Sequence, residues 1–424
     1  MAGTIACIDI GSSKICTVIA NVAYRRVVEI LGVGQAASRG VEKGIVVEID
    51  DATADIRDSL EAAESAAGLG ADRAFVGFSG KHIYSTNTVV SVDVARKDHL
   101  VTESDIEEAD RKLESISFPE NRVRVNVIRR QYALDNMDIA KNPLSMRGLR
   151  LDLEAHIVTA DLDYKQNILT CLERAGVPFS SGSFVANPWA SAEAVLEPED
   201  KEKGAIVVDI GGGSTSIAVY REGSIWYTAA LPVGGRQITS DLAACLNIPV
   251  TSAEELKMRV GTLYPEGEIQ ADTEVLERCG TSLDEVSYII RARVEEILMM
   301  TRSRVPYMPD ILVITGGTAN LPGMDRFTQE VFGLQARVGV PRCLPEDPKG
   351  LDDPVYASVI GLLLLGSWMA GLRSNGHGRF LQLYSGLRSG LSTARFRVPG
   401  VNFGAAGLGE SKDRILVPSR PVRE

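Results

Sequence analysis

The chain has 424 residues, which is too long for one ordinary compact domain, so the sequence predicts two or more. Hydrophobic residues make up 45% of it and the mean hydropathy is +0.02, as in globular proteins with ample core material. The formal net charge of −11 argues against bulk nucleic-acid binding, because that function needs a basic face.

The first 80 residues alternate between expected strands and one helix. Residues 5–10 and 15–20 are apolar runs typical of buried strands, and the turn Gly11-Ser12-Ser13-Lys14 joins them. Further strands are expected at 27–33 and 75–80. The apolar spacing over 51–67 predicts a helix between these two strands.

Residues 81–160 have a different pattern of apolar and polar side chains from the residues before them. Residues 88–95, 122–128 and 149–158 alternate between apolar and polar side chains, as strands do. Thr102 and Asp105 form a capping pattern ahead of an acidic helix. We interpret the block as a small α+β module inserted into the first domain. A helix is expected after it, over 163–176.

A second copy of the opening pattern begins at Ala205. Residues 5–20 and 205–220 each contain an apolar run, Asp-Ile-Gly, a short Gly/Ser loop and a second apolar run. Helices are expected at 252–261 and 282–305, the latter with a Ser282/Glu285 capping box. An apolar strand from residue 311 then runs into two glycines.

Residues 355–372 form the longest uncharged segment of this half of the chain. Its length could span a bilayer. Three glycines and two serines lower its hydropathy, and Asp352, Asp353 and Pro354 begin it as they begin helices of globular domains. We therefore predict a helix within a globular domain.

The repeated turn is suited to binding phosphate. Glycines bring main-chain N–H groups close to a ligand, and successive N–H groups form a concave anion site. Asp9 and Asp209, at the same place in the two copies, would repel phosphate unless Mg²⁺ lies between them. Taken singly, each Asp is also typical of an ordinary turn. Gly316-Gly317 is either a flat surface for an adenine ring or a plain strand-to-helix turn.

Two such turns followed by a strand ending in Gly-Gly resemble the actin/heat-shock-chaperone ATPase superfamily. Several segments are similar, in place and order, to the FtsA family of bacterial cell-division proteins. They are SRGVEKGIV (38–46), SGKHI (79–83), KNPLSMRGLRLDLEAHIVT (141–159), VVDIGGGSTSIAVY (207–220), SAEELKMRVG (252–261) and DDPVYASVIGLLL (352–364).

The resemblance implies an α/β, actin-like two-domain ATPase fold with an inserted α+β subdomain and a C-terminal amphipathic tail. Domain 1 would comprise residues 1–80 and 161–196, interrupted at 81–160 by the inserted subdomain for division-protein interactions. Domain 2 would comprise 197–370, with an outer subdomain at about 238–306. A flexible basic tail would follow at 371–424.

The resemblance also implies a site for ATP and Mg²⁺. Asp9 and Asp209 resemble the carboxylates that hold Mg²⁺ through water. The other matching positions are the two phosphate loops, the ribose and adenine contacts, and the adenine shelf: Gly11, Ser12, Ser13, Lys14, Gly211, Gly212, Gly213, Ser214, Glu254, Lys257, Gly316 and Gly317. Without the resemblance, Glu254 and Lys257 are typical of an exposed ion pair on a helix.

Two departures from the superfamily pattern predict slow or negligible hydrolysis. Many relatives have an acid where this chain has Ser216. Chaperone and rod-filament relatives have Glu where this chain has Asn187, and an amide cannot act as a base.

The basic tail contains a candidate membrane anchor. From Arg373 to the end, nine Lys/Arg stand against three Asp/Glu. An amphipathic stripe over 378–396, typical of interfacial helices, comprises Phe380, Leu383, Tyr384, Leu387 and Leu391. A helix packed on the body, or disorder, is the alternative.

By resemblance, the protein polymerises, tethers the tubulin-like protein FtsZ to the inner face of the cell membrane and recruits later division proteins. It would be cytoplasmic and peripheral to anionic membrane lipid at the division site. Arg291 and Arg293 are candidates for binding the acidic FtsZ C-terminal peptide, although helix 282–305 is also consistent with ordinary surface and core. A small-molecule kinase and a membrane-associated scaffold for another process, such as pilus assembly, are the alternatives.

Overall fold

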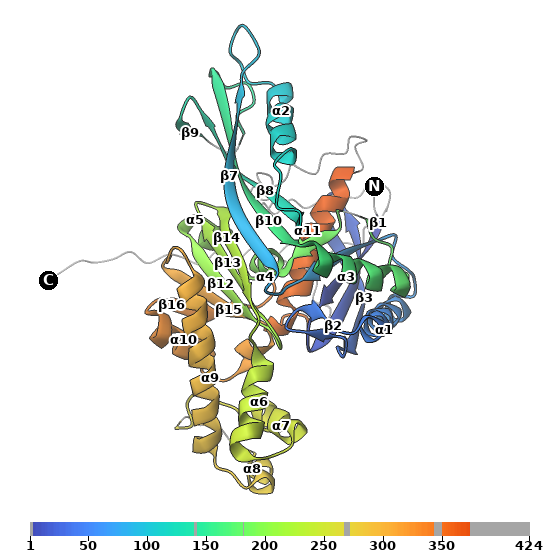
Figure 1. The fold of residues 1–424 in the computed structure, drawn as a ribbon, viewed down its shortest axis with the longest axis vertical. Helices are drawn as coiled ribbons and strands as arrows, with labels where there is room; N and C mark the ends of the chain where they lie inside the picture. The colour runs from blue at the N-terminus through green and yellow to red at the C-terminus, as the bar shows by residue number, and fades with distance from the viewer. Residues whose placement is uncertain (1–2, 140–141, 181, 267–271, 343–349, 374–424) are drawn as a thin grey trace, which may run out of the picture. The chain divides into compact units, whose positions relative to one another are not determined.

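The computed structural model describes residues 3–139, 142–180, 182–266, 272–342 and 350–373. The first sheet has the strand order β11-β6-β1-β2-β3 (Figure 1). Its strands are β1 (Gly3–Ile10), β2 (Lys14–Ala23), β3 (Arg26–Ala37), β6 (Arg73–Phe78) and β11 (Phe184–Ala186). Helices α1 (Ile49–Ala67) and α3 (Leu162–Ala175) pack on one face, and the short strands β4 (Val41–Glu42) and β5 (Ile45–Val46) precede α1.

The second sheet repeats this topology, with the strand order β14-β13-β12-β15-β16. Its strands are β12 (Ala205–Ile210), β13 (Thr215–Arg221), β14 (Ser224–Leu231), β15 (Ile311–Thr315) and β16 (Gln335–Val338). In both sheets the opening strand pairs antiparallel with the strand after its glycine turn and parallel with a later strand. The repeat in the sequence is therefore a repeat of a five-stranded sheet.

Side-chain alternation directs both aspartates into the layer between the sheets. In β1, residues 5 and 7 join a core shared with the second sheet, whereas residues 6, 8 and 10 face α1 and α3. In β12, residues 205 and 207 join the shared core, and residues 206, 208 and 210 face away from it. Because side chains alternate along a strand, Asp9 and Asp209 continue the inner rows at the carboxyl ends of their strands.

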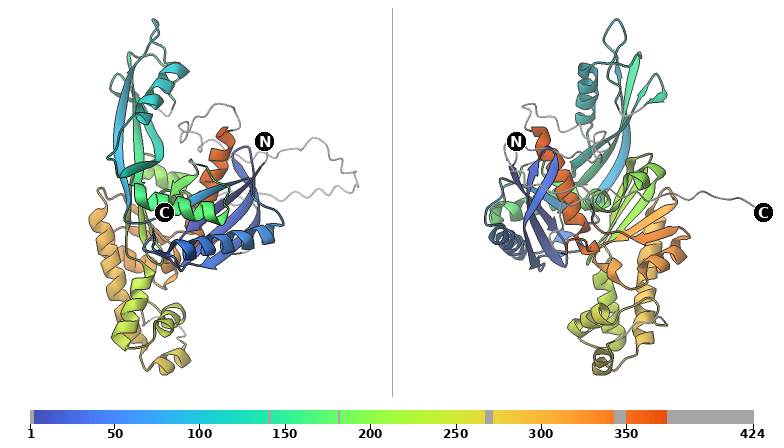
Figure 2. Two further views of the ribbon diagram at one scale, coloured as in Figure 1. Left: turned by 45° about the vertical axis from the view of Figure 1, so that its right-hand side comes forward. Right: turned by 180° about the vertical axis from the view of Figure 1, so that it is seen from behind.

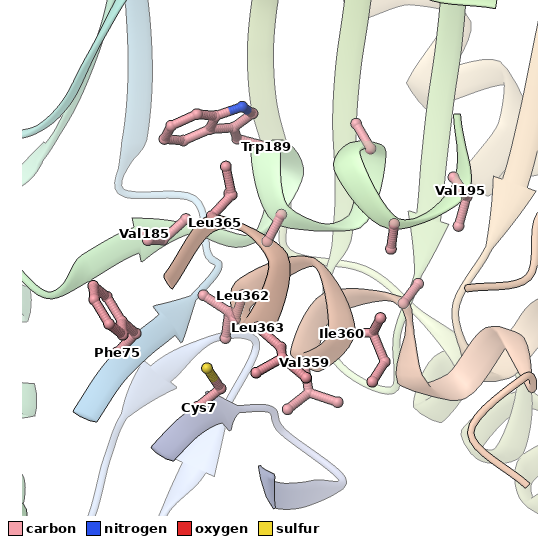
Figure 3. Packing of buried hydrophobic residues seen from close by; sticks show 14 of the residues in the cluster. Cys7, Phe75, Val185, Trp189, Val195, Val359, Ile360, Leu362, Leu363 and Leu365 are labelled. Atoms are coloured by element: carbon pink, nitrogen blue, oxygen red, sulfur yellow. The ribbon is translucent and has the colours of Figure 1, made fainter. Parts of the chain in front are cut away.

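Two helices, α4 (Asn187–Val195) and α11 (Ala357–Arg373), lie between the sheets (Figures 1 and 2). Every residue of α4 is buried. Val359, Ile360, Leu362 and Leu363 of α11 pack against β1, β6 and α4 (Figure 3). The prediction of a globular-domain helix over 355–372 is thus confirmed. Among the described residues, no helix combines the length and apolar character needed to cross a membrane.

The inserted block folds as a separate antiparallel sheet with the strand order β7-β10-β8-β9. Its strands are β7 (Ile83–Asp93), β8 (Arg122–Leu134), β9 (Met137–Ile139) and β10 (Arg150–Asp161). Helix α2 (Glu103–Glu114) packs on this sheet through a core of its own. Thr102 and Asp105 form the expected capping box, in which Thr102 N donates to Asp105 Oδ2 at 2.8 Å. The predicted α+β insertion is therefore confirmed.

Helices α6 (Gly235–Leu246), α7 (Val250–Arg259), α8 (Thr273–Cys279), α9 (Leu283–Arg304) and α10 (Met324–Phe332), with the 3₁₀ turn η1 (Gly317–Asn320), share a core with the outer face of the second sheet. Helix α5 (Pro198–Lys203) contacts β13, and the 3₁₀ turn η2 (Pro354–Tyr356) precedes α11. Ser282 caps α9 by accepting from Glu285 N at 3.2 Å. The Glu285 carboxylate accepts from Thr281 Oγ1 at 2.9 Å instead of from the main-chain N–H of Ser282. Of the two hydrogen bonds of the expected capping box, only the one to the Ser282 side chain is therefore present at this helix start.

A buried histidine joins the inserted sheet to β14. His156 Nδ1 lies 2.7 Å from Asn87 Oδ1, and its Nε2 lies 3.1 Å from Thr228 Oγ1. Because the amide oxygen can only accept, Nδ1 carries the proton and Nε2 accepts from the threonine hydroxyl. Burial, with the nearby Arg130 charge, lowers the pKa of His156 to about 3. Burial, with Lys81, lowers the pKa of His82 to about 4.

We predict that His82 and His156 lower the free energy of unfolding as the pH is lowered from 7 to 5, and that proton uptake by Asp9, whose pKa is raised to about 6 in the folded state, offsets part of this fall. Unfolded histidine has a pKa of about 6.5 and takes up protons in this window, whereas both folded side chains stay neutral. Each histidine should cost about 2 kcal/mol at pH 5, seen as a lower urea midpoint. His156→Gln should flatten this pH slope, and His99→Asn, at an exposed residue, should leave it unchanged. An unchanged slope in His156→Gln would contradict the assignment.

Candidate functional site

A cavity of about 570 Å³ lies where the loops after β1 and β12 meet. This volume is typical of small-molecule sites. Every residue predicted to bind nucleotide or Mg²⁺ lines it: Asp9, Gly11, Ser12, Ser13, Lys14, Asp209, Gly211, Gly212, Gly213, Ser214, Glu254, Lys257, Gly316 and Gly317. The fold thus brings into one cavity groups from both copies of the repeated turn.

The two glycine loops approach each other closely. A Cβ on Gly212 would lie 1.8 Å from Ser13 Oγ, so a side chain there would displace the first loop. The second loop is held by α6, because Gly235 N donates to Gly211 O at 2.8 Å and Arg236 N to Gly212 O at 2.7 Å. The conformation of this loop is therefore supported by the protein itself.

Helix α4 contacts both aspartates. Asn187 Nδ2 donates to Asp9 Oδ1 at 2.7 Å. One turn later, Ser191 Oγ donates to Asp209 Oδ2 at 2.5 Å, and Ser358 Oγ of α11 donates to the same oxygen at 2.9 Å. The carboxylates of the two sheets are thus positioned by the two helices that lie between the sheets.

Burial dominates the electrostatics of both carboxylates. It raises the pKa of Asp9 to about 6, against the hydrogen bond from Asn187 and the Lys14 charge, and Asp209 adds to the increase. Burial also raises the pKa of Asp209, against the hydrogen bonds from Ser191 and Ser358. A buried and a half-buried carboxylate facing one cavity favour a cationic ligand, because their charges are poorly solvated there.

Glu254 and Lys257 form an ion pair at the cavity wall, with 2.7 Å between Oε2 and Nζ. Lys257 Nζ also donates to Thr239 Oγ1 at 2.9 Å and to Gly235 O at 3.3 Å. Only 12% of the Lys257 side chain is exposed, whereas 47% of Glu254 is. The two side chains form the ion pair that is typical of residues three apart on a helix, and this pair lines the cavity next to α6.

Gly316 brings the Gly-Gly turn close to Asp209. Its φ is +85°, and a Cβ on it would lie 2.3 Å from Asp209 Oδ1. Gly316 N donates to Pro354 O at 3.2 Å, which ties the turn to η2. The turn therefore requires glycine on two counts, its backbone conformation and its contact with the carboxylate.

Sequence reasoning missed several lining residues. Ser79, Asp353 and Ser358 line the cavity, and Tyr356 of η2 lies beside it, its ring centroid 4.3 Å from Lys14 Nζ. Tyr356 OH accepts from Gln35 Nε2 at 2.8 Å. These residues lie in the segments 79–83 and 352–364 that resemble the family, but their place at the cavity depends on how η2, β3 and β6 meet in the fold.

Arg291 and Arg293 lie on α9, and both are bound to other groups of the domain. Arg291 Nη1 donates to Leu263 O at 2.7 Å, and its guanidinium lies 4.6 Å from the Phe327 ring centroid. Arg293 Nη2 donates to Asp241 Oδ1 at 2.9 Å. The predicted membrane stripe, Phe380, Leu383, Tyr384, Leu387 and Leu391, lies outside the described residues.

We predict that Gly316→Ala lowers the free energy of unfolding by about 3 kcal/mol, because a methyl group is forced onto Asp209 in a left-handed backbone. Gly333→Ala measures the cost of a left-handed conformation alone, since Gly333 has a φ of +70° and a ψ of +24° and a Cβ added to it would meet nothing within 4 Å. Gly316 has a ψ of 168°, in a region nearly exclusive to glycine, so the backbone cost adds to the contact there. Gly333→Ala should cost only about 1 kcal/mol for the backbone conformation. Equal urea midpoints for the two variants would contradict the contact with Asp209.

Comparison with known proteins identifies the family. The family described as Cell division protein FtsA matches residues 206–361, and the SHS2 domain inserted in FtsA matches residues 80–159. The FtsA of Borreliella burgdorferi is 34% identical over 370 residues, covering 84% of this chain and 89% of that protein. The FtsA of Bacillus subtilis is 32% identical over 372 residues, covering 84% and 82%.

Solved structures support the fold alone. A PilM-PilN type IV pilus biogenesis complex matches with a TM-score of 0.57 at 18% identity, covering 87% of this chain and 98% of that one. MreB5 of Spiroplasma citri bound to ADP matches with a TM-score of 0.50 at 11% identity, covering 88% and 99%. Both agree with the predicted actin-like architecture. By the extent of its similarity to the curated relatives, the chain belongs to the FtsA family of cell-division proteins.

Proposed function

We propose that this FtsA-family protein binds ATP and Mg²⁺ in the cavity between its two sheets. The observation that carries the proposal is that both copies of the repeated turn line one cavity, each with a glycine loop and a carboxylate, of which Asp209 is buried and Asp9 half-buried. Two carboxylates with adjacent phosphate loops are the donor set that Mg²⁺ bound to phosphate prefers. Asp9 and Asp209 would hold the ion through water.

The other lining residues fit the rest of the nucleotide. The loops 11–14 and 211–214 would bind phosphate, Glu254 and Lys257 the ribose and base, and Gly316-Gly317 the adenine face. Asn187 Oδ1 is buried without a hydrogen-bond partner, although the same residue lines the cavity. A water of the bound ion would satisfy this oxygen, because a buried acceptor without a partner is costly. Bound Mg²⁺ would supply charge neutralisation at the phosphates.

We infer that ATP turnover is slow, because Asn187 and Ser216 stand where an acid or base would activate water. The full chain with ATP and Mg²⁺ should release phosphate at well under about 1 per second, below the range of about 1–100 per second of kinases. Phosphate release is measured with a coupled assay, and Asp9→Asn corrects for contaminating activity. Rates in the kinase range that Asp9→Asn abolishes would contradict this expectation.

Membership of the FtsA family implies a role in cell division. From it we infer the specific activities of this protein. The protein would polymerise, tether FtsZ filaments to the inner membrane face and recruit later division proteins, partly through the inserted subdomain. The net charge of the tail, with nine basic and three acidic residues, supports an anionic lipid surface as its partner. A pilus scaffold and a small-molecule kinase have no comparable support from the relatives.

Membrane attachment should depend on the tail. With anionic phospholipid vesicles and ATP, the full chain should sediment and bring FtsZ with it, whereas a chain ending at Asn375 should stay in solution. Leu387→Glu should abolish sedimentation because it places charge on the apolar stripe. Ser389→Glu adds the same charge off the stripe and should weaken binding far less. Sedimentation of the chain ending at Asn375 would show that another face binds lipid.

An acidic FtsZ peptide would have to displace Asp241 from Arg293. We therefore expect Arg293→Ala and the Arg291→Ala/Arg293→Ala pair to weaken peptide affinity roughly tenfold, the loss of one charge-assisted hydrogen bond. Asp241→Asn is the informative partner variant, since it leaves Arg293 paired with Glu296 alone and should strengthen binding. Affinities are measured by fluorescence anisotropy. An unchanged affinity in the double variant would reject this docking site.

A further inference from the structure

Two serine hydroxyls join the halves of the chain at the cavity wall. Ser79 follows β6 of the first sheet, Ser216 lies in β13 of the second, and their Oγ atoms are 2.8 Å apart. The two residues are 5% and 4% exposed, and both line the cavity. The proposed nucleotide contacts leave this pair without a role.

One hydroxyl proton of the pair is not used in the hydrogen bond between the two serines. Two hydroxyls carry two O–H groups, and the bond between them consumes one. Within the described part of the chain, no other acceptor contacts either Oγ. One O–H at the wall of the cavity is therefore free to donate. A phosphate oxygen is a suitable acceptor, because hydrogen bonds to charged groups are the stronger ones.

Both serines are also connected to the inserted sheet. Ser79 stands directly ahead of the turn that begins β7. Ser216 pairs with Ala230 of β14, the strand that contacts β7 of the inserted sheet. There, Ser85 Oγ of β7 donates to Thr228 O of β14 at 2.7 Å. A change at the serine pair would thus reach the junction between β7 and β14 through both strands.

We propose that the Ser79–Ser216 pair contacts the terminal phosphate of a bound nucleoside triphosphate and fixes the position of the inserted sheet on β14 when that phosphate is present. The inference rests on the proposed nucleotide site. A triphosphate takes up the free O–H and holds Ser79 and Ser216 together across the cavity. A diphosphate lacks this phosphate, so the pair is held by its own hydrogen bond alone. The partner-binding insert thereby responds to the phosphate state of the nucleotide.

The test compares ATP and ADP affinity of the full chain, using fluorescent analogues with Mg²⁺. The double variant Ser79→Ala/Ser216→Ala should weaken ATP binding roughly tenfold, the loss of one hydrogen bond to a charged group, and ADP binding less than about twofold. The single variant that removes the donating hydroxyl should match the double variant, and the other single variant should weaken ATP binding less. Ser183→Ala is the matched control. It removes the hydroxyl of a buried serine, whose Oγ lies 3.1 Å from that of the half-buried Ser180, and neither residue is among those that line the cavity.

Hydrogen exchange gives a second readout that a purely structural role would not move. Residues 83–93 should exchange more slowly with ATP than with ADP in the wild type and in Ser183→Ala. This difference should disappear in Ser216→Ala. Equal losses of ATP and ADP affinity, or an exchange difference that persists in Ser216→Ala, would overturn the proposal. A wild-type chain that binds neither nucleotide would instead overturn the nucleotide site itself, and this inference with it.

Discussion

One turn of helix α4 determines how the two halves of the cavity meet. Asn187 at the start of the helix binds Asp9 of the first sheet, and Ser191, four residues later, binds Asp209 of the second. Four residues of helix rise by about 6 Å, so helix geometry itself sets the separation of the two anchoring side chains. Ser358 of α11 adds a bond to Asp209 from the second helix of the layer.

This arrangement explains why the chain contains the acid-marked turn twice. A single sheet offers one carboxylate and one glycine loop at the end of its first strand. A second sheet of the same topology supplies the other pair only if the side chain of its aspartate points toward the shared core. This is so in both strands, where residues 5, 7 and 9 and residues 205, 207 and 209 point to the same side. Because α4 and α11 are packed against both sheets, a ligand bound between the carboxylates acts on the same helices that connect the two halves.

The repeated strands, the capped helix α2 and the inserted sheet could be predicted from the sequence, since each has a strong local pattern of alternation, capping or repetition. The short strand β11 and the first turn of α6 lack such patterns, whereas the small helix α8 is flanked by Asp272 and Gly280 and could have been predicted from these caps. The two turns, their aspartates and Gly316-Gly317 were predicted from the residues themselves, Glu254 and Lys257 through the resemblance, and all of them line one cavity. Ser79 and Ser358 lie in segments that resemble the family, but neither they nor Ser191 was given a role, because the role of a buried serine depends on a partner that is distant in the sequence. Arg291 and Arg293, in turn, have internal partners that α9 alone could not indicate.

The central claim is that the two turns form one site for ATP with Mg²⁺, and calorimetric titration of the full chain tests it most directly. The account predicts one ATP bound per chain in the presence of Mg²⁺, with affinity lost on chelation and in both Asp9→Asn and Asp209→Asn. Binding that is independent of Mg²⁺ and unaffected by either substitution, or no binding at all, would contradict it.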